Sequence, residues 1–400
     1  MKKIVYIMMI LLPALMITGC EDYELGYPAA STVADFSFSV GNDGYAPAEV
    51  TFTNKSLNAT GYQWNFGNGQ TSTDENPVVF YETPGLYSVT LTCTPVNDVH
   101  YNKLVKTLAV NVKDPLAGLT KVLYFTTRSP DGGGVHMVIL NDEAPIVQDF
   151  ETVELDRPYG IAVDTATRKV FVSDYASGFI YSFNPDGTNP VRILDVNVAG
   201  QEIVEQPEAL MVVGDKLYWG RVGGIYRCNL DGSNPEPFIQ TGETISPEWP
   251  IDMQYDEASG KIYFVNDRTD YSGGYWSVNF DGSNMQELIL DIDGTAIEVD
   301  FETSKTYMAV YAVDGTQITE NGIYMCNLDG TGISKIGDFG TKATWGMTMD
   351  NELKKLFWAY KISNSAPDGK IVRANMDGTG LEDFITGVSP HAMQIVWIKL

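Results

Sequence analysis

Cysteine and histidine are scarce in this sequence. Its 400 residues include 4 cysteines and 3 histidines, and they contain no CxxC, HExxH or P-loop motif. The cysteines after Cys20 are Cys93, Cys228 and Cys326, an odd number for a disulfide framework. Cys228 and Cys326 stand at matching places of two repeats, so we expect both to be buried, unpaired side chains. No disulfide scaffold, zinc finger or nucleotide phosphate loop is predicted.

Basic residues are also few. Lysine and arginine total 26 against 52 acidic residues, which gives a formal net charge of −26. Such a chain repels the phosphates of nucleic acids and anionic membrane surfaces. We therefore expect no nucleic-acid partner.

Long apolar runs are absent after the first 20 residues. Lys2 and Lys3 precede an apolar stretch from Ile4 to Ile17 that is interrupted by Pro13. It is shorter than the about 20 apolar residues that a spanning helix needs, and its charged start is typical of a signal peptide. Residues 1–19 are predicted to be that peptide, and no later segment could span a bilayer.

The leader ends in small residues before Cys20, in the string Leu-Met-Ile-Thr-Gly-Cys. This string resembles a bacterial lipobox, which implies that Cys20 is acylated, for example with palmitate, and becomes the first mature residue. Residues 20–32 form a tether that begins with Glu21, Asp22 and Glu24. It resembles the sorting signal of lipoproteins on the surface of glycan-foraging Gram-negative bacteria. The resemblance implies an outer-membrane, cell-surface location with the lipid as the only membrane anchor.

Residues 33–113 alternate apolar and polar side chains in short runs, the period of half-buried strands. Asn68-Gly69 predicts a tight turn. These two residues end the string Tyr62–Gly69, and a second string, Tyr81–Leu91, follows later in the sequence. Together these strings resemble the polycystic-kidney-disease (PKD) domain, which implies an immunoglobulin-like sandwich with Trp64 in its core. That family usually has aspartates where this chain has Asn65 and Asn68, which argues against an ion site there.

Residues 119–400 repeat one unit. The motif Asn-x-Asp-Gly ends at Gly187, Gly232, Gly282, Gly330 and Gly378, and a lysine opens a short apolar run at Lys121, Lys169, Lys216, Lys261, Lys305 and Lys355. Four short strands in each 45 to 50 residues are typical of a β-propeller blade. The strings resemble the YWTD repeats of low-density-lipoprotein receptors, which form six-bladed propellers. The expected fold class is all-β: a PKD-like sandwich followed by a six-bladed propeller.

The first repeat lacks an innermost strand, and the sequence ends with a spare one, His391 to Trp397. We expect this last strand to complete the first blade, which would remove an open sheet edge.

The innermost strands of the six repeats align at one position. It carries Gly160, Ala209, Asp252, Ala296, Gly346 and Ala392. Small side chains there are expected to be structural, because the strands crowd at the axis. Asp252 is the exception, a carboxylate at or near the channel that needs a partner or water if it is buried.

One residue earlier the six strands carry Tyr159, Glu208, Ile251, Thr295, Trp345 and His391, which should ring one end of the channel, here called the mouth. The loops after the lysine-led strands add Arg128, Asp174, Tyr175, Arg221, Asn266, Asp267, Arg268, Tyr311, Tyr360 and Lys361. Aromatic rings mixed with Arg, Asp and Asn can stack on sugars and bond their hydroxyls, or grip a protein loop. The ligand-binding residues proposed from sequence are Tyr159, Glu208, Asp252, Trp345, His391, Arg128, Arg221, Arg268 and Tyr360.

Three functions follow from these patterns. The first is non-catalytic binding of an extracellular polysaccharide at the mouth, and the second is binding of a surface protein in adhesion or assembly. The third is that of a metal-dependent propeller lyase or lactonase, with Glu208, Asp252, Asn266, Asp267 and His391 as ligand candidates. No nucleophile and base can be paired by spacing, so no enzyme activity, cofactor or resident metal is predicted.

Overall fold

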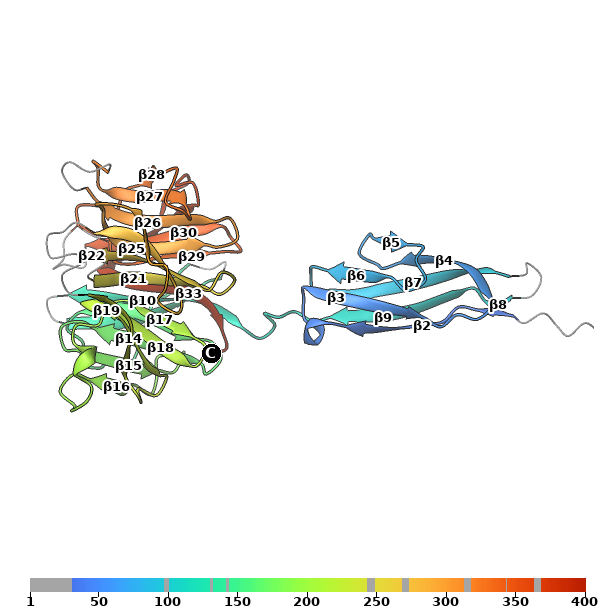
Figure 1. Ribbon diagram of the computed structural model, residues 1–400, viewed down its shortest axis with the longest axis horizontal. Coiled ribbons are helices and arrows are strands. Elements are labelled where there is room, and N and C mark those ends of the chain that lie inside the picture. The colour runs from blue at the N-terminus through green and yellow to red at the C-terminus, as the bar shows by residue number, and fades with distance from the viewer. Residues whose placement is uncertain are drawn as a thin grey trace, which may run out of the picture. The chain divides into compact units, whose positions relative to one another are not determined.

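The computed structural model describes residues 31–96, 101–129, 132–141, 144–242, 249–267, 273–312, 318–342, 344–362 and 368–400. The chain divides into two compact units, Met1–Ala117 and Gly118–Leu400 (Figure 1). Cys20 and Arg268 lie outside the described residues, as do the leader and most of the tether. None of the described segments forms a helix long and apolar enough to cross a membrane.

Unit 1 is built from short strands in the predicted all-β pattern. They are β1 (Thr32–Val33), β2 (Phe36–Val40), β3 (Ala48–Asn54), β4 (Ala59–Asn65), β5 (Thr71–Ser72), β6 (Val78–Tyr81), β7 (Gly85–Pro95), β8 (Tyr101–Lys103) and β9 (Val105–Val112), with the 3-10 helix η1 (Asn42–Gly44). Two antiparallel sheets, β2-β3-β6 and β5-β4-β7-β9, enclose the core, and β1 pairs with β8 in parallel.

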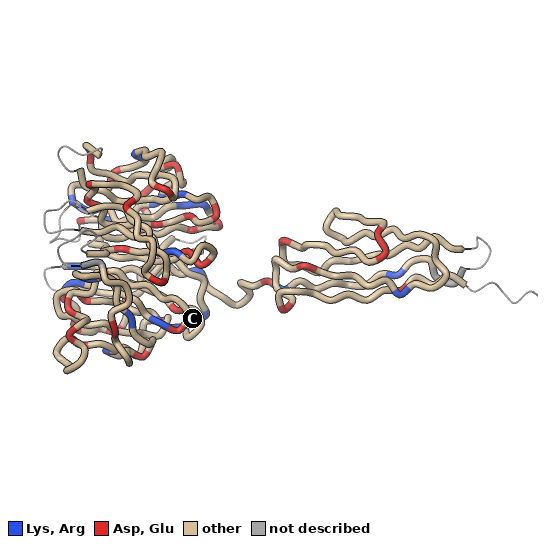
Figure 2. Tube along the Cα trace, viewed as in Figure 1, with Lys and Arg blue, Asp and Glu red and all other residues tan. Residues whose placement is uncertain are grey.

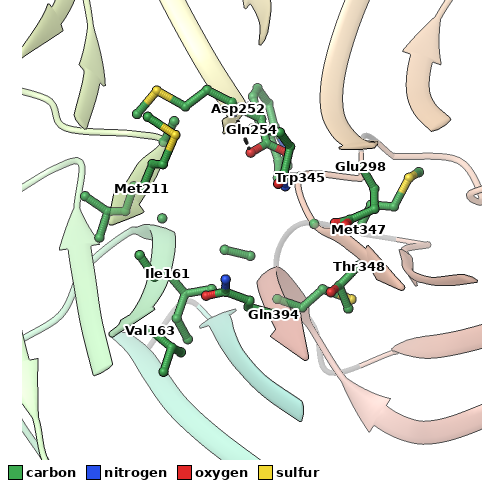
Figure 3. A pocket seen from close by; sticks show the side chains of 18 of the residues that line it. Ile161, Val163, Met211, Asp252, Gln254, Glu298, Trp345, Met347, Thr348 and Gln394 are labelled. Carbon is green, nitrogen blue, oxygen red and sulfur yellow. Dashed lines mark hydrogen bonds between the residues drawn. The ribbon is translucent and has the colours of Figure 1, made fainter. Parts of the chain in front are cut away.

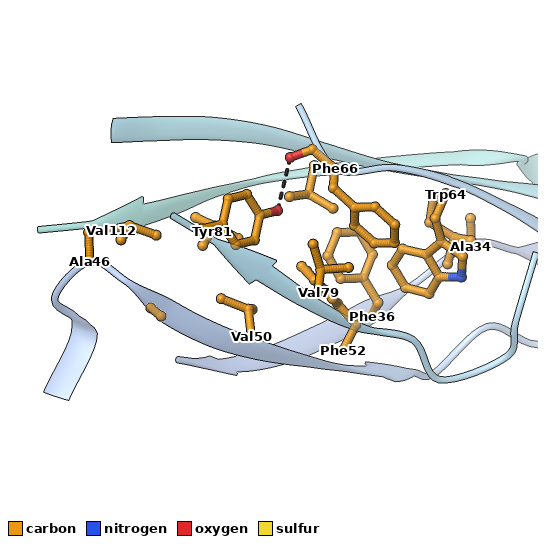
Figure 4. Packing of buried hydrophobic residues seen from close by; sticks show 14 of the residues in the cluster. Ala34, Phe36, Ala46, Val50, Phe52, Trp64, Phe66, Val79, Tyr81 and Val112 are labelled. Atoms are coloured by element: carbon orange, nitrogen blue, oxygen red, sulfur yellow. Dashed lines mark hydrogen bonds between the residues drawn. The ribbon is translucent and has the colours of Figure 1, made fainter. Parts of the chain in front are cut away.

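The core of unit 1 is aromatic. The ring of Trp64 is fully buried and lies 5.0 Å from that of Phe36 and 5.5 Å from that of Phe52 (Figure 4). Its indole N–H donates to the carbonyl of Asp74 at 2.8 Å, so the burial leaves no polar group unpaired. The Tyr81 hydroxyl likewise donates to the carbonyl of Phe66 at 2.9 Å. The prediction that Trp64 is a core residue is confirmed.

The side chains of Asn65 and Asn68 accept hydrogen bonds from nearby backbone. The Asn65 side chain accepts from the backbone N–H of Gly67 at 2.9 Å, and that of Asn68 accepts from Gln70 at 3.1 Å. Gly69 has a φ of +87°, as the predicted tight turn between β4 and β5 requires.

Unit 2 contains, within its described residues, six four-stranded antiparallel sheets arranged as propeller blades. The strands are β10 (Thr120–Ser129), β11 (Gly132–Ile139), β12 (Gln148–Asp149), β13 (Pro158–Asp164), β14 (Lys169–Asp174), β15 (Phe179–Phe183), β16 (Val191–Asp195), β17 (Leu210–Val213), β18 (Lys216–Arg221), β19 (Gly223–Asn229), β20 (Glu236–Gly242), β21 (Trp249–Asp256), β22 (Lys261–Asp267), β23 (Gly274–Asn279), β24 (Gln286–Ile289), β25 (Asp293–Asp300), β26 (Lys305–Tyr311), β27 (Gly322–Asn327), β28 (Ser334–Gly337), β29 (Met347–Asp350), β30 (Lys355–Tyr360), β31 (Gly369–Asn375), β32 (Glu382–Val388) and β33 (Pro390–Ile398), with the 3-10 helix η2 (Glu202–Val204). Five sheets use four consecutive strands each, β13 to β16 being the first such set.

The remaining sheet joins two distant segments. Its order is β12-β11-β10-β33, and β33 pairs antiparallel with β10. The predicted pairing of the last strand with the first repeat is thus observed. The innermost strands also contact one another in sequence, β13 with β17 and onward to β29, and β33 contacts both β29 and β13.

The two sequence markers of the repeat are hydrogen-bonded to each other in four of the sheets. The ammonium of Lys169 donates to the Asn184 side chain at 3.0 Å, and Asn184 in turn donates to the Thr188 hydroxyl at 3.0 Å. Asp186 closes the turn by accepting from the Thr188 backbone N–H. Equivalent lysine–asparagine bonds join Lys216 to Asn229, Lys305 to Asn327, and Lys355 to Asn375.

Lys121 departs from this arrangement. Its ammonium lies 2.9 Å from the carboxylate of Asp350 and 2.8 Å from that of Glu352. Lys121 and Asp350 are both buried, and they belong to the sheet of β10 and the sheet of β29. The first and last sheets are therefore joined by an ion pair as well as by adjacent strands.

The glycine that ends each Asn-x-Asp-Gly turn packs against the preceding sheet. Gly232 has a φ of +83°, and a Cβ there would lie 2.0 Å from the carbonyl oxygen of Ile193. Gly378 repeats this, with its Cβ position 1.9 Å from the carbonyl oxygen of Ile336. The motif needs glycine for its backbone angle and for the close approach between sheets.

We expect Gly232→Ala to lower the free energy of unfolding more than Gly214→Ala does. Gly214 also has positive φ, +61°, but a Cβ there would meet nothing within 4 Å. Both changes should cost roughly 1–2 kcal/mol for the left-handed backbone, and Gly232→Ala a further about 1–3 kcal/mol for the steric conflict. Chemical denaturation followed by tryptophan fluorescence measures both, and equal losses would contradict the packing role of Gly232.

Candidate functional site

The innermost strands approach one another too closely for larger side chains at the aligned position. A Cβ on Gly160 would lie 2.1 Å from the carbonyl oxygen of Glu208, and one on Gly346 would lie 1.7 Å from that of His391. The small residues of this position are therefore structural, as the sequence predicted.

A cavity of about 270 Å³ runs between these strands. It is lined by residues of the innermost strands and the segments just before them, and Tyr159 and Trp345 line it at the mouth. Further along the strands, Met211, Gln254, Glu298, Thr348 and Gln394 surround it (Figure 3). The side chains of this second set stand two residues beyond the aligned position, on the same face of each strand.

Asp252 lines the cavity and holds two neighbouring strands together. One carboxylate oxygen accepts from the backbone N–H of Met253 at 2.9 Å, and the other from that of Ile297 on β25 at 2.8 Å. Burial nevertheless raises the pKa of Asp252 to about 7, and the two backbone bonds only partly oppose that rise.

Glu298 is a second carboxyl of the cavity, and the sequence analysis missed it. Burial raises its pKa well above the usual value, and repulsion from Asp252 and Asp300 adds to the effect. The period-2 alternation of a strand could have found it, because Glu298 follows the aligned Ala296 by two residues.

Five rings form a continuous aromatic wall at the mouth. Tyr159 stacks on Trp345 with centroids 5.5 Å apart and an interplanar angle of 11°, and it lies 4.3 Å from the ring of His391. On its other side, Tyr159 lies 4.9 Å from Tyr175, which stacks on Trp249 at 6.0 Å. The alignment of the innermost strands predicted Tyr159, Trp345 and His391 at the mouth. It missed Trp249, which precedes the aligned position by three residues.

The wall is bordered by charged groups of both signs. Burial of Tyr159 raises its pKa to about 12, and the charge of the buried Glu208 adds to this rise. Arg128 and Arg157 oppose it. Burial and the nearby Arg128 lower the pKa of Lys361 to about 7. Burial, with Lys361 and Arg128 nearby, lowers the pKa of His391 well below its usual value.

Other residues proposed from sequence are engaged within their own sheets. The Arg221 guanidinium lies 3.7 Å from the Glu205 carboxylate and 5.3 Å from the centre of the Tyr226 ring. The ring of Tyr360 lies beneath the Lys370 ammonium at 4.9 Å. Neither residue lines the cavity.

Asp174 and Asn266, expected among the exposed polar groups of the mouth, are instead buried and hold loops. Asp174 is fully buried and accepts from the backbone N–H groups of Asp156 and Arg157 at 2.7 and 2.8 Å. Asn266, also fully buried, accepts from the backbone of Gly274 at 2.9 Å. The sequence placed both near the mouth correctly but gave them the wrong role, because a loop-capping carboxylate or amide has the same local sequence as a ligand-binding one.

No cluster of three histidine, cysteine, aspartate or glutamate side chains suited to a metal ion occurs among the residues that the structure describes. Cys228 and Cys326 are free and buried, as predicted, and Cys93 is free and buried as well. Burial raises the pKa of Cys228 and of Cys326 to about 12, so both are thiols at neutral pH.

Residues 28–112 match the family described as the PKD domain. Among solved structures, a chain of the nidogen/laminin complex matches with a TM-score of 0.53 and 14% identity, over 69% of this chain and 98% of that chain. TolB from Acinetobacter baumannii matches with a TM-score of 0.50 and 12% identity, over 78% and 80% of the two chains. These matches support the propeller fold of unit 2 and carry no more than the fold.

A curated relative, protein cueball of Drosophila grimshawi, is 23% identical over 175 residues, which are 42% of this chain and 28% of the relative. The chain therefore spans less than a third of that relative's length.

We expect the stability of unit 2 to fall as the pH rises from about 4 to about 7. The raised pKa of Asp252, about 7 against an ordinary 3.8, means that the folded chain holds a proton that the unfolded chain releases within this window. Glu298 contributes in the same direction. Above about pH 7 the contribution of Asp252 should be constant.

Asp252→Asn should flatten this pH dependence, because an amide does not ionise. The matched control is Asp291→Asn, an exposed turn residue with a φ of +51° that asparagine also tolerates. Unfolding midpoints in a series of buffers at constant ionic strength measure the effect. An unchanged slope in Asp252→Asn would show that another group titrates.

Proposed function

We propose that this protein is a non-catalytic lipoprotein of the cell surface that binds an extracellular polysaccharide at the mouth of its propeller. The observation that carries the proposal is the aromatic wall of Tyr159, Tyr175, Trp249, Trp345 and His391 at one end of the axial cavity.

The wall has the chemistry that sugar rings require. Tyr159 and Trp345 are only partly buried and line the cavity, so their ring faces and edges supply apolar surface next to polar groups. The C–H faces of a sugar can rest on such rings. Arg128 and Glu208 beside them supply a donor and an acceptor for hydroxyls.

The location part of the proposal comes from the sequence. The charged start, the short apolar run and the small residues before Cys20 support an exported chain with a lipid at that cysteine. The PKD domain that follows Cys20 would act as a spacer, and the propeller would carry the recognition site.

Trp345→Ala should weaken binding to a responding polysaccharide by about tenfold or more, equivalent to about 1.4 kcal/mol. Tyr159→Ala should act in the same direction because the two rings stack. The matched control is Trp397→Ala: Trp397 is also partly buried but lies near the opposite end of β33. A glycan panel followed by calorimetry measures affinity; the proposal fails if no glycan binds the parent protein, or if the mouth and control variants bind equally well.

Cys20→Ser should abolish incorporation of a palmitate analogue and move the protein out of the membrane fraction. Cys93→Ser is the control, since Cys93 is a buried free thiol of unit 1 and should keep both label and location. Labelled cells separated into membrane and aqueous fractions show the outcome. Membrane retention with full label in Cys20→Ser would refute the anchor.

The same experiments separate the two alternative functions. If no glycan binds, a partner cross-linked on intact cells through the mouth would favour a protein-binding adhesion or assembly module. Consumption of a glycan or lactone that stops on addition of a chelator would instead favour a metal-dependent lyase or hydrolase.

A further inference from the structure

Three basic side chains meet where the last sheet of the propeller adjoins the first. Arg128 lies near the end of β10, His391 near the start of β33, and Lys361 directly after β30. The backbone N–H of Arg128 donates to the carbonyl of Ser389 at 3.0 Å. The N–H of Ala359, two residues before Lys361, donates to Gly346 at 3.1 Å, and Gly346 packs directly against the backbone of His391.

Lys361, His391 and Ser389 are buried, and no acidic side chain of the described residues acts on Lys361 or His391. Lys361 is 2% exposed, His391 1% and Ser389 4%. Neither ring nitrogen of His391 nor the hydroxyl of Ser389 has a hydrogen-bond partner among the described residues. Among the residues that the structure describes, the charged neighbour that affects Lys361 is another cation, Arg128. A buried cation without a nearby carboxylate is costly, and each unsatisfied polar group adds to the cost.

The missing counter-charge is unusual for this chain. Acidic residues outnumber basic ones two to one and are spread over the strands and loops of unit 2 (Figure 2). Four other lysines of unit 2 have acidic partners, for example Lys335 with Glu320 and Asp338, and four bind asparagine side chains. Glu208, the acid of the mouth, acts on Tyr159 and is not among the charges that act on Lys361 or His391.

The basic group adjoins the aromatic wall. His391 packs against Tyr159 at 4.3 Å and against Trp345 at 5.7 Å, and Arg128 is near enough to Tyr159 to affect its hydroxyl. A sugar ring bound against Tyr159 and Trp345 would thus bring its substituents towards the partly exposed guanidinium of Arg128.

We propose that Arg128, Lys361, His391 and Ser389 form an anion subsite that takes the carboxylate of an acidic sugar, a uronate. This rests on the proposed polysaccharide function and names its ligand class. The planar guanidinium of Arg128 matches a carboxylate in two hydrogen bonds. The buried ammonium of Lys361 then gains a negative charge, which no described residue supplies.

Binding should be coupled to protonation of Lys361. A carboxylate beside it favours the ammonium form, so binding raises its pKa from about 7. Affinity should therefore fall by about tenfold between pH 6 and pH 8, where the free protein loses this proton. His391 stays neutral across this range because its pKa is depressed, and Tyr159 stays protonated because its pKa is raised.

The test compares sugars that differ only in one carboxylate. The purified protein is titrated with sodium glucuronate and glucose, and with sodium galacturonate and galactose, at constant ionic strength, with the unfolding midpoint and calorimetry as readouts. We expect at least one uronate to stabilise the protein and its neutral counterpart to do so at least tenfold more weakly. Glucose 6-sulfate distinguishes a general anion site from one for carboxylates.

Variants locate the effect. Arg128→Gln should reduce uronate affinity by tenfold or more, and Lys361→Met should remove the pH dependence between 6 and 8. Because Lys361→Met removes a buried charge, it should fold at least as well as the parent protein. Lys335→Met, which removes a paired surface lysine, should change neither property.

The outcomes separate the subsite from the general function. If neutral glycans of the panel bind and no uronate binds better than its neutral counterpart, the subsite is wrong and polysaccharide binding stands. Equal affinity for glucose 6-sulfate and for a uronate would overturn the assignment of the subsite to uronates. If uronates bind equally well to Arg128→Gln and to the parent protein, they bind elsewhere and the subsite is again wrong.

Discussion

The crowding of six innermost strands around one axis is the constraint on which the rest of unit 2 depends. It admits only glycine or alanine at five of the six aligned positions, and a Cβ added to Gly160 or Gly346 would clash with a carbonyl oxygen of the next strand. The exception, Asp252, fits because its carboxylate accepts backbone N–H groups from its own strand and from its neighbour. The crowding is limited to this position. Two residues further along the strands longer side chains line the cavity, and there is also space at the mouth, where the strands begin.

Much of the fold could be predicted from the sequence because the repeat has a local physical basis. The lysine and the Asn-x-Asp-Gly motif are partners in a hydrogen-bond network within one sheet. The last position of the motif favours glycine because of its positive φ and its contact with the preceding sheet. The motif recurs in five of the six blades and so appears as a regular spacing in the sequence. The first sheet lacks the motif, and there Lys121 binds Asp350 of the last sheet instead.

The site was less predictable because it depends on neighbours between sheets. The innermost strands shift register at their starts, as between Pro158 and Gly160, Pro250 and Asp252, and Gly294 and Ala296. An alignment by sequence position therefore found Tyr159 and Trp345 but missed Trp249. It also could not reveal that Lys361 and His391, 30 residues apart in sequence, share a buried environment in which no described acidic residue acts on them. Asp174 and Asn266 show the opposite error. They were expected to face a ligand, but their side chains bond to loop backbone, and residue type alone does not reveal such contacts.

The pairing of β33 with β10 has a consequence for the order of folding. Tyr124 lies opposite Gln394, so this sheet must wait for a loop closure across most of unit 2, whereas every other sheet can form from consecutive strands. Long-range contacts of this kind form late and slowly. Arg128 and His391 sit on the two strands concerned, so their meeting marks a fully assembled propeller. A chain with five finished sheets would have most of its core and still lack the place where these residues come together.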